Sequence, residues 1–432
     1  MVEQKDFKYK SFYTSLFSTN YFFQGVTTSV FTVIIPIHLL TLTGGISASD
    51  IAFLASIILI PWALKVFFGI LSDKYGTKRF GRRKPYIIVP FVIAGIIWII
   101  LSFPNLATPS NALIVYTVSG VLINFGVAIG DTALDGLIID TCPKSKLGRA
   151  QGFCWGMNSV GVIAGGPMLA FLLISFDLVS VYTIFLIIGL AMIFIPFLML
   201  LVNDSIQVPE VKLKLHLKKM FNNSRDWKAY IYSMSRAFLD GVILLLISIY
   251  TLIKLGLIKT DGVTLSIEGS NLNVYLYQAY VSLIISVGII IGAIAGGQTA
   301  DRLSRRLSVV ISVIITVVSL FLLLIDYSIV LVLLFIASLT GASLGWRRSS
   351  ASAIISEISK EHPEMDSTYF SIAMAFANIG ASLGLLLTGI FLNFTQDYQA
   401  TFLFLALLSL LVLIPLFLMD PKDYEYKINS EA

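Results

Sequence analysis

The chain is built largely from apolar runs that are each long enough to cross a lipid bilayer. An α-helix rises about 1.5 Å per residue, so roughly 20 apolar residues span the hydrocarbon core. Backbone polar groups find no water in lipid, and runs of this kind therefore fold as helices. We read about twelve of them, at approximately 15–42, 50–72, 86–103, 112–140, 150–175, 179–202, 229–255, 274–299, 308–326, 329–358, 368–394 and 399–419. The sequence predicts an all-α membrane protein with twelve transmembrane helices.

Composition agrees with this class. Hydrophobic residues make up 57% of the chain and charged residues only 13%, outside the usual range of soluble domains. We expect the first run to be a retained helix, because it is longer than the core of a signal peptide. The two Cys and three His residues form no cluster of the kind that binds zinc, and no His, Cys and Ser constellation suggests an enzyme. We expect neither a cofactor nor a metal.

The positive charges indicate how the chain lies across the membrane. Of the 30 Lys and Arg residues, 24 fall in turns on one side, whereas the opposite turns hold Lys259 alone. Turns rich in Lys and Arg face the cytosol, so both termini are expected there, with the chain in the cytoplasmic (plasma) membrane. The net charge of +5 then reflects contact with anionic membrane lipids rather than nucleic-acid binding.

A polar stretch divides the chain into two halves. Leucines alternate with lysines in 203–228, so this linker either lies on the inner membrane surface or is a solvated tether. We expect an N-terminal six-helix bundle at 1–202, a cytosolic linker at 203–228, a C-terminal six-helix bundle at 229–420 and a cytosolic tail at 421–432. Among the outer turns, the longest, at about 256–273, is expected to form a small hairpin.

Paired glycines recur in both halves. Small residues four apart allow two helices to approach closely in lipid. Such pairs recur at similar positions in the two halves, as Gly126 and Gly130 with Gly341 and Gly345, and as Gly161 and Gly165 with Gly380 and Gly384. This recurrence predicts an internal duplication and two pseudo-symmetric bundles that rock about a central site.

A basic turn also occurs once in each half. The first contains Gly69, Asp73, Arg82 and Arg83, and the second contains Asp301 and Arg302. A carboxylate at a helix end beside arginines can join two bundles in one conformation and release them in the other. We expect these residues to act in gating; the alternative is that the turns only set the topology.

Several motifs together resemble a known family. They are Tyr21-Phe-Phe-Gln24-Gly25, Pro61-Trp62-Ala-Leu-Lys65, the first basic turn ending in Gly81-Arg82-Arg83-Lys84-Pro85-Tyr86, Asp131-x-x-x-Asp135 and Gly148-Arg149-Ala-Gln-Gly152. With six helices in each half, the chain resembles the major facilitator superfamily. Its N-terminal half is most similar to folate–biopterin transporters and to the related muropeptide and acetyl-CoA permeases, although the Gly-Arg-Arg-Lys-Pro-Tyr piece also resembles sugar–cation symporters.

The resemblance implies a carrier with a central cavity lined by the first, fourth, seventh and tenth helices. Charges inside a membrane span are costly and mark functional sites or fixed pairs. Those in this chain are Lys65, Asp131, Asp135, Arg236, Asp240, Arg347 and Arg348. The slight excess of positive charges favours an anionic or zwitterionic solute.

Asp131 and Asp135 are the expected proton-coupling pair. They lie four residues apart and share one helix face. Two carboxylates this close repel each other, so one of them can hold a proton near neutral pH. The alternative is that one of them is the permanent partner of a base on the fifth or tenth helix.

Each of the remaining candidate site residues has two possible roles. Arg347 or Arg348 can face the cavity and pair with an aspartate of the other bundle, or both can be fixed structural partners. Arg236 and Asp240 are four apart and can pair with each other or clamp a substrate. Lys65 can be functional or can extend towards the membrane surface. Gln24 and Thr28 can bind a solute or serve helix packing.

The sequence therefore predicts a monomeric secondary transporter that moves a small organic solute by alternating access, most simply as a symporter with protons. Substrate contacts are expected from Gln24, Thr28, Asp131, Asp135, Arg236, Asp240, Arg347 and Arg348. The alternatives are an antiporter or drug exporter and, in another class, a receptor or scaffold that transports nothing.

Overall fold

The computed structural model describes residues 10–77, 80–142, 144–175, 180–202, 218, 220–268, 271–325, 327, 329–359 and 366–425. Ten helices in these ranges are long and apolar enough to cross a membrane, and two shorter apolar helices lie at Gly156–Leu172 and Ile243–Lys254. The predicted all-α membrane fold is confirmed, whereas the exact count of twelve spans stays a prediction.

The helices group into two compact units. The first comprises Met1–Ile35 with Leu64–Glu210, and the second comprises Pro36–Ala63 with Val211–Ala432. Segment 36–63 thus packs with helices that come much later in the chain. The expected division of the chain at the 203–228 linker stays a prediction.

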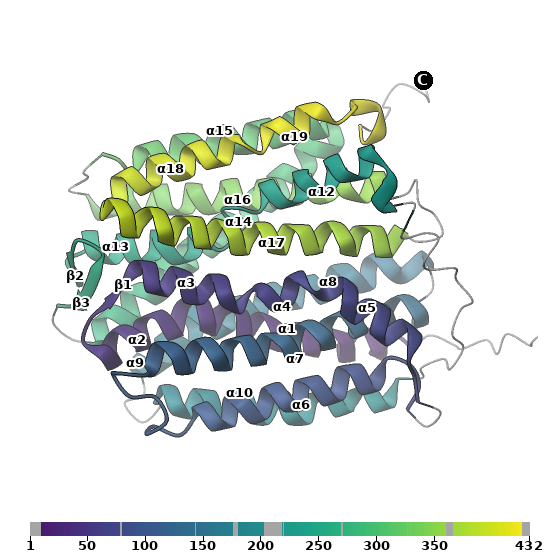
Figure 1. Ribbon diagram of the computed structural model, residues 1–432, viewed down its shortest axis with the longest axis horizontal. Coiled ribbons are helices and arrows are strands. Elements are labelled where there is room, and N and C mark those ends of the chain that lie inside the picture. Colours follow the sequence, from purple (N-terminus) through teal and green to yellow (C-terminus); the bar gives the residue numbers. More distant parts are fainter. Residues whose placement is uncertain are drawn as a thin grey trace, which may run out of the picture. The chain divides into compact units, whose positions relative to one another are not determined.

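The first unit is made of helical segments alone in the part of the chain that the structure describes (Figure 1). They are α1 (Phe12–Ser29), the π-helical η1 (Val30–Ile34), α5 (Lys65–Lys74), α6 (Lys84–Leu101), α7 (Ala112–Thr141), α8 (Lys144–Ile163), the π-helical η2 (Ala164–Met168), α9 (Leu169–Ser175), α10 (Val181–Phe194) and the 3-10 helix η3 (Ile195–Leu201).

The second unit combines helices with a small sheet (Figure 1). Its helical segments are α2 (Ile35–Thr43), α3 (Ala48–Ile58), α4 (Ile60–Ala63), α12 (Ser224–Arg236), the π-helical η4 (Ile243–Ile247), α13 (Ser248–Lys254), α14 (Asn271–Arg302), α15 (Arg305–Leu322), α16 (Val330–Ser359), α17 (Asp366–Thr395), α18 (Tyr398–Leu410), α19 (Leu413–Leu418) and the 3-10 helix η5 (Pro421–Asp423). Its strands are β1 (Ile46–Ser47), β2 (Ile258–Asp261) and β3 (Thr264–Ile267).

The expected hairpin is present. Strands β2 and β3 pair antiparallel, and the turn between them contains Gly262 with φ of +61°, a conformation that glycine adopts most readily. Strand β1 adds a third strand through the pair Ile46 and Leu265. The two-residue β1 carries too short a pattern to be predicted from the sequence.

Helix α3 packs on α17 through polar as well as apolar contacts. The hydroxyls of Ser56 and Ser382 each donate to the other residue's backbone carbonyl, both at 2.8 Å. Asn378 Nδ2 donates to the carbonyl of Trp62 at 3.3 Å. Side chains thus satisfy backbone oxygens here, where lipid would offer them no partner.

The chain crosses between the units three times, and the two crossings within the described residues fall at irregular points of a span. The first is at Ile35 and Pro36, directly after the π-helical turn η1. Proline has no N–H to donate, and a π-helical turn is one way for a helix to accommodate the gap. The second crossing is at Ala63 and Leu64, between α4 and α5.

The seventh expected span, 229–255, is not one continuous helix. Helix α12 ends at Arg236, a turn follows, and the chain then enters the π-helical η4. Asp240 lies in that turn rather than within a regular helix.

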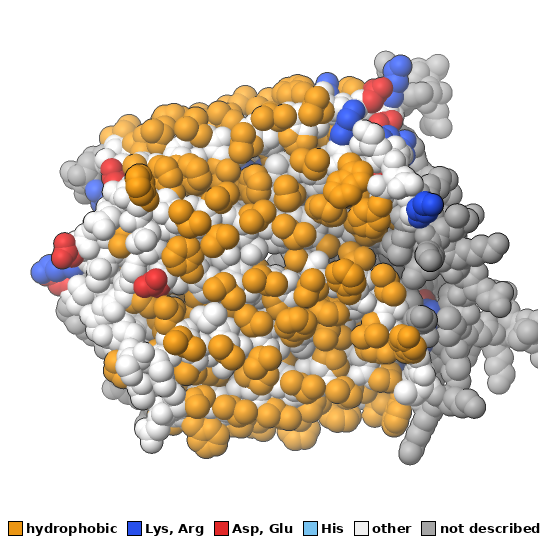
Figure 2. Space-filling model, viewed as in Figure 1, with side chains coloured by type: hydrophobic (Ala, Val, Ile, Leu, Met, Phe, Trp, Pro, Cys, Tyr) orange, Lys and Arg blue, Asp and Glu red, His pale blue; other side chains and the backbone are white. Residues whose placement is uncertain are grey.

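Large apolar side chains face outward. On the face seen in Figure 2, hydrophobic side chains cover the helices, while charged side chains gather near helix ends. Ile114, Leu331 and Phe335 are 68%, 76% and 65% exposed, respectively. Exposed apolar surface of this extent suits contact with lipid rather than water.

The paired glycines lie where helices touch. A Cβ on Gly161 would come within 2.0 Å of the Phe22 carbonyl oxygen on α1, and one on Gly380 within 1.9 Å of the Met234 carbonyl oxygen on α12. The fifth span thus packs on the first as the eleventh packs on the seventh, in agreement with a duplication. The other two pairs differ, because Gly126 meets α6 whereas Gly341 meets α14.

We predict that Gly161→Ala destabilises the protein, because the added methyl group overlaps the backbone of α1. Overpacking of this kind costs about 1–3 kcal/mol, which thermal unfolding of the purified protein measures. Gly156→Ala is the matched control on the same helix, since nothing lies within 4 Å of its Cβ position. Equal melting temperatures for the two variants would contradict the packing.

Candidate functional site

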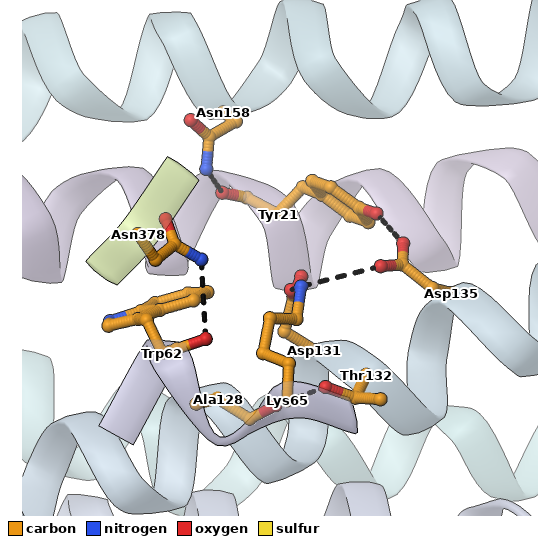
Figure 3. A network of polar contacts seen from close by, with 9 residues as sticks. All are labelled: Tyr21, Trp62, Lys65, Ala128, Asp131, Thr132, Asp135, Asn158 and Asn378. Carbon is orange, nitrogen blue, oxygen red and sulfur yellow. Dashed lines mark hydrogen bonds and ion pairs between the residues drawn. The ribbon is translucent and has the colours of Figure 1, made fainter. Parts of the chain in front are cut away.

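A buried cluster in the first unit joins Lys65 to both predicted proton-coupling aspartates (Figure 3). Lys65 begins α5 immediately after the turn at Leu64. Its ammonium pairs with Asp131 Oδ2 and lies 3.6 Å from Asp135 Oδ2. The side chain of Lys65 is only 15% exposed. The prediction that Asp131 and Asp135 share one face is therefore confirmed.

Two of the alternatives raised by the sequence are wrong for this cluster. The base that pairs with Asp131 comes from the second span, not from the fifth or tenth helix. Lys65 also does not extend towards the membrane surface, because its ammonium lies between the two carboxylates. Lys65 and Asp131 are 66 residues apart, so only the packing of α5 against α7 brings them together.

Tyr21 completes the cluster and was missed as a site residue. Its hydroxyl donates to Asp135 Oδ1, and its side chain is 1% exposed. Asn158 on α8 donates to the Tyr21 carbonyl at 3.2 Å. The signal that could have found Tyr21 is its place at the start of the family-like motif of the first span.

The two expected solute-binding residues of the first span lie farther along α1. Gln24 and Thr28 follow Tyr21 by three and seven residues and therefore share its helix face. The Thr28 hydroxyl donates to the Gln24 carbonyl at 3.0 Å. Gln24 is 3% exposed, and no described residue accepts from its Nε2. Their contact with a solute stays a prediction.

A second cluster of charges, in the second unit, centres on Asp240. Its Oδ2 lies 3.1 Å from Arg348 Nε and 3.5 Å from Arg236 Nη1. Arg236 and Asp240 therefore pair with each other, which is one of the two alternatives that the sequence left open, and Arg348 pairs with the same aspartate. The predicted contact of an aspartate with an arginine of the other bundle stays a prediction.

Arg347, the remaining arginine, differs from its neighbours. It is 1% exposed, yet none of its guanidinium nitrogens has a hydrogen-bond partner among the described residues. A buried charge in this condition is costly.

The first basic turn is anchored by an acid that the sequence reasoning did not single out. Arg82 Nη2 and Arg83 Nε lie 2.6 and 3.1 Å from the same oxygen, Oδ2 of Asp140 at the end of α7. Arg83 also donates to Ser72 at 2.7 Å. A Cβ at Gly136 would come within 2.4 Å of the Arg83 guanidinium carbon, so the glycine provides its space.

The second basic turn repeats this arrangement. Arg305 Nη1 lies 3.1 Å from Glu357 Oε2 near the end of α16, the helix that the duplication pairs with α7. Glu425 accepts from the backbone N–H groups of Arg305 and Arg306 and so caps α15. Asp140 and Glu357 occupy matching helix ends, a signal that the repeat carries in the sequence.

The remaining gating candidates contribute less to the described contacts. Gly69 packs towards Thr132, with 3.5 Å from its Cβ position to the Thr132 methyl group. Arg302 is exposed. The side chains of Asp73 and Asp301 lie outside the described residues, so their predicted role in gating stays a prediction.

Membrane-length helices that enclose buried ion pairs define a polytopic α-helical membrane protein. The chain matches the Major Facilitator Superfamily over residues 17–267 and 262–432. It belongs to this family of transporters, whose members carry small solutes and are not enzymes. The predicted superfamily is therefore confirmed.

Curated relatives match parts of the chain. "Probable folate-biopterin transporter 4" of Arabidopsis thaliana is 26% identical over 32% of this chain and 28% of its own length. "Putative transporter AmpG 1" of Rickettsia conorii is 25% identical over 49% of this chain and 52% of its own length. The matches thus span about a quarter to a half of these relatives.

Among solved structures, a D-xylose–proton symporter has the same fold. Its TM-score to this chain is 0.68 at 14% sequence identity, covering 96% of this chain and 99% of the symporter. At this identity the likeness shows the fold alone.

We predict that Asp140→Ala strongly destabilises the protein, because it removes the carboxylate that two buried guanidiniums share. Loss of one partner of a buried pair costs about 3–5 kcal/mol. Glu268→Ala is the control, since Lys259 and Glu268 are 67% and 46% exposed and such surface pairs contribute about 0–1 kcal/mol. Thermal unfolding of both variants checks this, and a loss at Asp140 no larger than at Glu268 would count against it.

Proposed function

We propose that this chain is a secondary active transporter that moves a small organic solute by alternating access, as a proton symporter. The observation that carries the proposal is the cluster of Lys65, Asp131, Asp135 and Tyr21. With both carboxylates ionised, the two aspartates and the ammonium carry a net charge of −1 at a site where the Lys65 and Asp131 side chains are 15% and 6% exposed and that of Asp135 is 31% exposed. One added proton makes the cluster neutral, so a single proton is the natural coupling unit.

Proton binding would change the contacts of the cluster. In the present arrangement Tyr21 donates to Asp135, which must therefore offer a lone pair. If Asp135 takes up the proton, it becomes a donor itself, and its attraction for Lys65 falls. Lys65 then pairs with Asp131 alone, and the helices α1, α5 and α7 that hold these residues are free to shift. This change links protonation to the arrangement of the first unit.

The breaks in the helices support a moving structure. Segment η1 is a π-helical turn within the continuous first span, and η4 follows the turn that breaks the seventh span; the duplication pairs these two spans. π-Helical turns occur often at functional sites, and in transporters discontinuous helices surround the substrate site. The gating role would belong to residues of the two basic turns, which are Gly69, Asp73, Arg82, Arg83, Asp301 and Arg302.

The residues proposed to contact the solute are Gln24, Thr28, Asp131, Asp135, Arg236, Asp240, Arg347 and Arg348. The family and the relatives named for folate–biopterin transport support a small organic solute, and the symporter with the same fold supports proton coupling. We propose that the chain acts as a monomer in the cytoplasmic membrane. Both termini would lie in the cytosol, because the Lys and Arg residues concentrate in the turns of one side.

The same cluster could serve an exchanger, because it does not set the direction in which the solute moves. Reconstitution into proteoliposomes that contain a pH-sensitive dye separates the possibilities. When solute is added outside, symport predicts that the lumen of the proteoliposomes becomes more acidic. Antiport predicts that protons leave the lumen, so that it becomes less acidic. If a broad panel of metabolites moves no solute and no protons, the chain acts as a receptor or scaffold instead.

We predict that Asp131→Asn and Asp135→Asn each abolish uptake against a gradient while part of the solute exchange remains. An amide cannot take up and release the coupling proton, yet it keeps the size of the side chain. Asp397→Asn is the control, because this exposed aspartate only caps α18 and asparagine caps equally well. Undiminished accumulation in both cluster variants would remove these aspartates from the coupling role.

A further inference from the structure

Arg347 is held in an unusual environment. It is the eighteenth residue of α16, a helix of 30 residues, and so lies near the middle of its length. Seventeen residues of the helix precede Arg347 and twelve follow it, so each end of the helix is at least about 18 Å away along the axis. Its Nε, Nη1 and Nη2 atoms are all buried without an acceptor in the part of the chain that the structure describes. Buried polar groups without a partner are rare and call for an explanation.

The described groups around Arg347 accept no hydrogen bond from it in this structure. It interacts electrostatically with Asp240, Arg236, Arg348 and Tyr232. Asp240 Oδ2 already serves both Arg236 and Arg348. The second terminal nitrogen of Arg236 meets only the Met374 thioether at 3.6 Å, which is a weak acceptor.

The unsatisfied atoms at this place are mostly donors. The Tyr232 hydroxyl is fully buried and also has no partner among the described residues. Among the described residues, Asp240 Oδ1 is an unsatisfied carboxylate oxygen beside them. Three guanidiniums and one carboxylate leave a local charge of +2, which repels a cation and is not balanced by a neutral solute.

We propose that Arg347, together with Arg236 and Tyr232, binds an anionic group of the solute, either a carboxylate or a phosphate. The inference rests on the proposed transport function and names the chemistry of its substrate. A planar guanidinium matches the two oxygens of a carboxylate or phosphate and binds both. The tyrosine hydroxyl would donate to a further lone pair.

Binding requires a movement, because Arg347 is 1% exposed in this structure. The arginine side chain has several rotatable bonds and can change its position. Its present buried position is costly, because the guanidinium donates no hydrogen bond to a described residue. An arriving anion would therefore draw Arg347 out of its present position and remove that cost. Relief of the unfavourable free energy of the buried guanidinium would in this way add to the binding free energy of the solute.

The full-length protein, purified in detergent, allows a direct test with simple anions. Its melting temperature is measured in increasing sodium phosphate and, separately, in sodium succinate, each against sodium chloride at equal ionic strength. We expect a saturable rise in at least one series. A rise with phosphate alone identifies a phosphate-bearing solute, and a rise with succinate alone identifies a carboxylate. No rise beyond that with chloride in either series overturns the proposal.

Substitution of Arg347 separates a binding role from a structural one. Arg347→Met replaces an unpaired charge by an apolar chain of similar length, so it should raise the melting temperature without added anions and abolish the response to them. Arg347→Lys keeps the charge and should retain a response weakened by about tenfold or more, because a point charge replaces the two-pronged contact.

Arg305→Met is the matched control. Arg305 is also buried but pairs with Glu357, so its loss should lower the melting temperature and leave the anion response intact. A lowered melting temperature in Arg347→Met, or an unchanged anion response in it, would refute the subsite.

The test distinguishes this inference from failure of the proposed function, because it uses neither a membrane nor a gradient. An anion response lost in Arg347→Met, without proton-driven uptake in proteoliposomes, would leave the subsite in place and reject the coupling. Proton-driven uptake of neutral solutes without any anion response would support the coupling and reject the subsite.

Discussion

Charge inside an apolar body must be paired, and the ion pair of Lys65 with Asp131 shows how this chain meets that condition. The ammonium lies beside two carboxylates rather than one, and Tyr21 donates to the second. An arrangement with one base for two acids is stable only if a hydrogen bond or a proton compensates the remaining charge. The same requirement that organises α1, α5 and α7 around the cluster thus makes it responsive to protons.

The second unit meets the requirement only partly. One carboxylate oxygen of Asp240 serves two arginines, and Arg347 beside them has no acceptor among the described residues. In a folded protein such a deficit has to be offset by the rest of the structure. Here the tight packing of α16 against α14 supplies part of the compensation, since Gly345 places its helix against the Ile289 carbonyl of α14. A deficit retained in the middle of a helix points to a partner from outside the chain.

The basic turns show the same principle at the helix ends. In each unit an arginine after the turn reaches an acid near the end of a long helix, Asp140 on α7 and Glu357 on α16. Long charged side chains can extend to such ends from neighbouring helices. These pairs tie a turn to the helix beside it, so that movement of either element is passed on to the other.

By itself the sequence determined the class of fold and which charges lie in the apolar runs. Both are local properties, because a run of apolar residues in lipid can only be helical and a charge within it stands out whatever surrounds it. The glycine pairs also indicated the close contacts of the fifth and eleventh spans.

The partners of the charged and polar side chains were decided only by the tertiary structure. Lys65 with Asp131, Tyr21 with Asp135 and Arg82 with Asp140 are separated by 66, 114 and 58 residues. Which helix faces meet depends on packing over the whole unit, and the π-helical turn before Pro36 and the break beyond Arg236 change the direction of those faces. For the same reason the isolation of Arg347, whose neighbour Arg348 is paired, is a property of the fold and not of the local sequence.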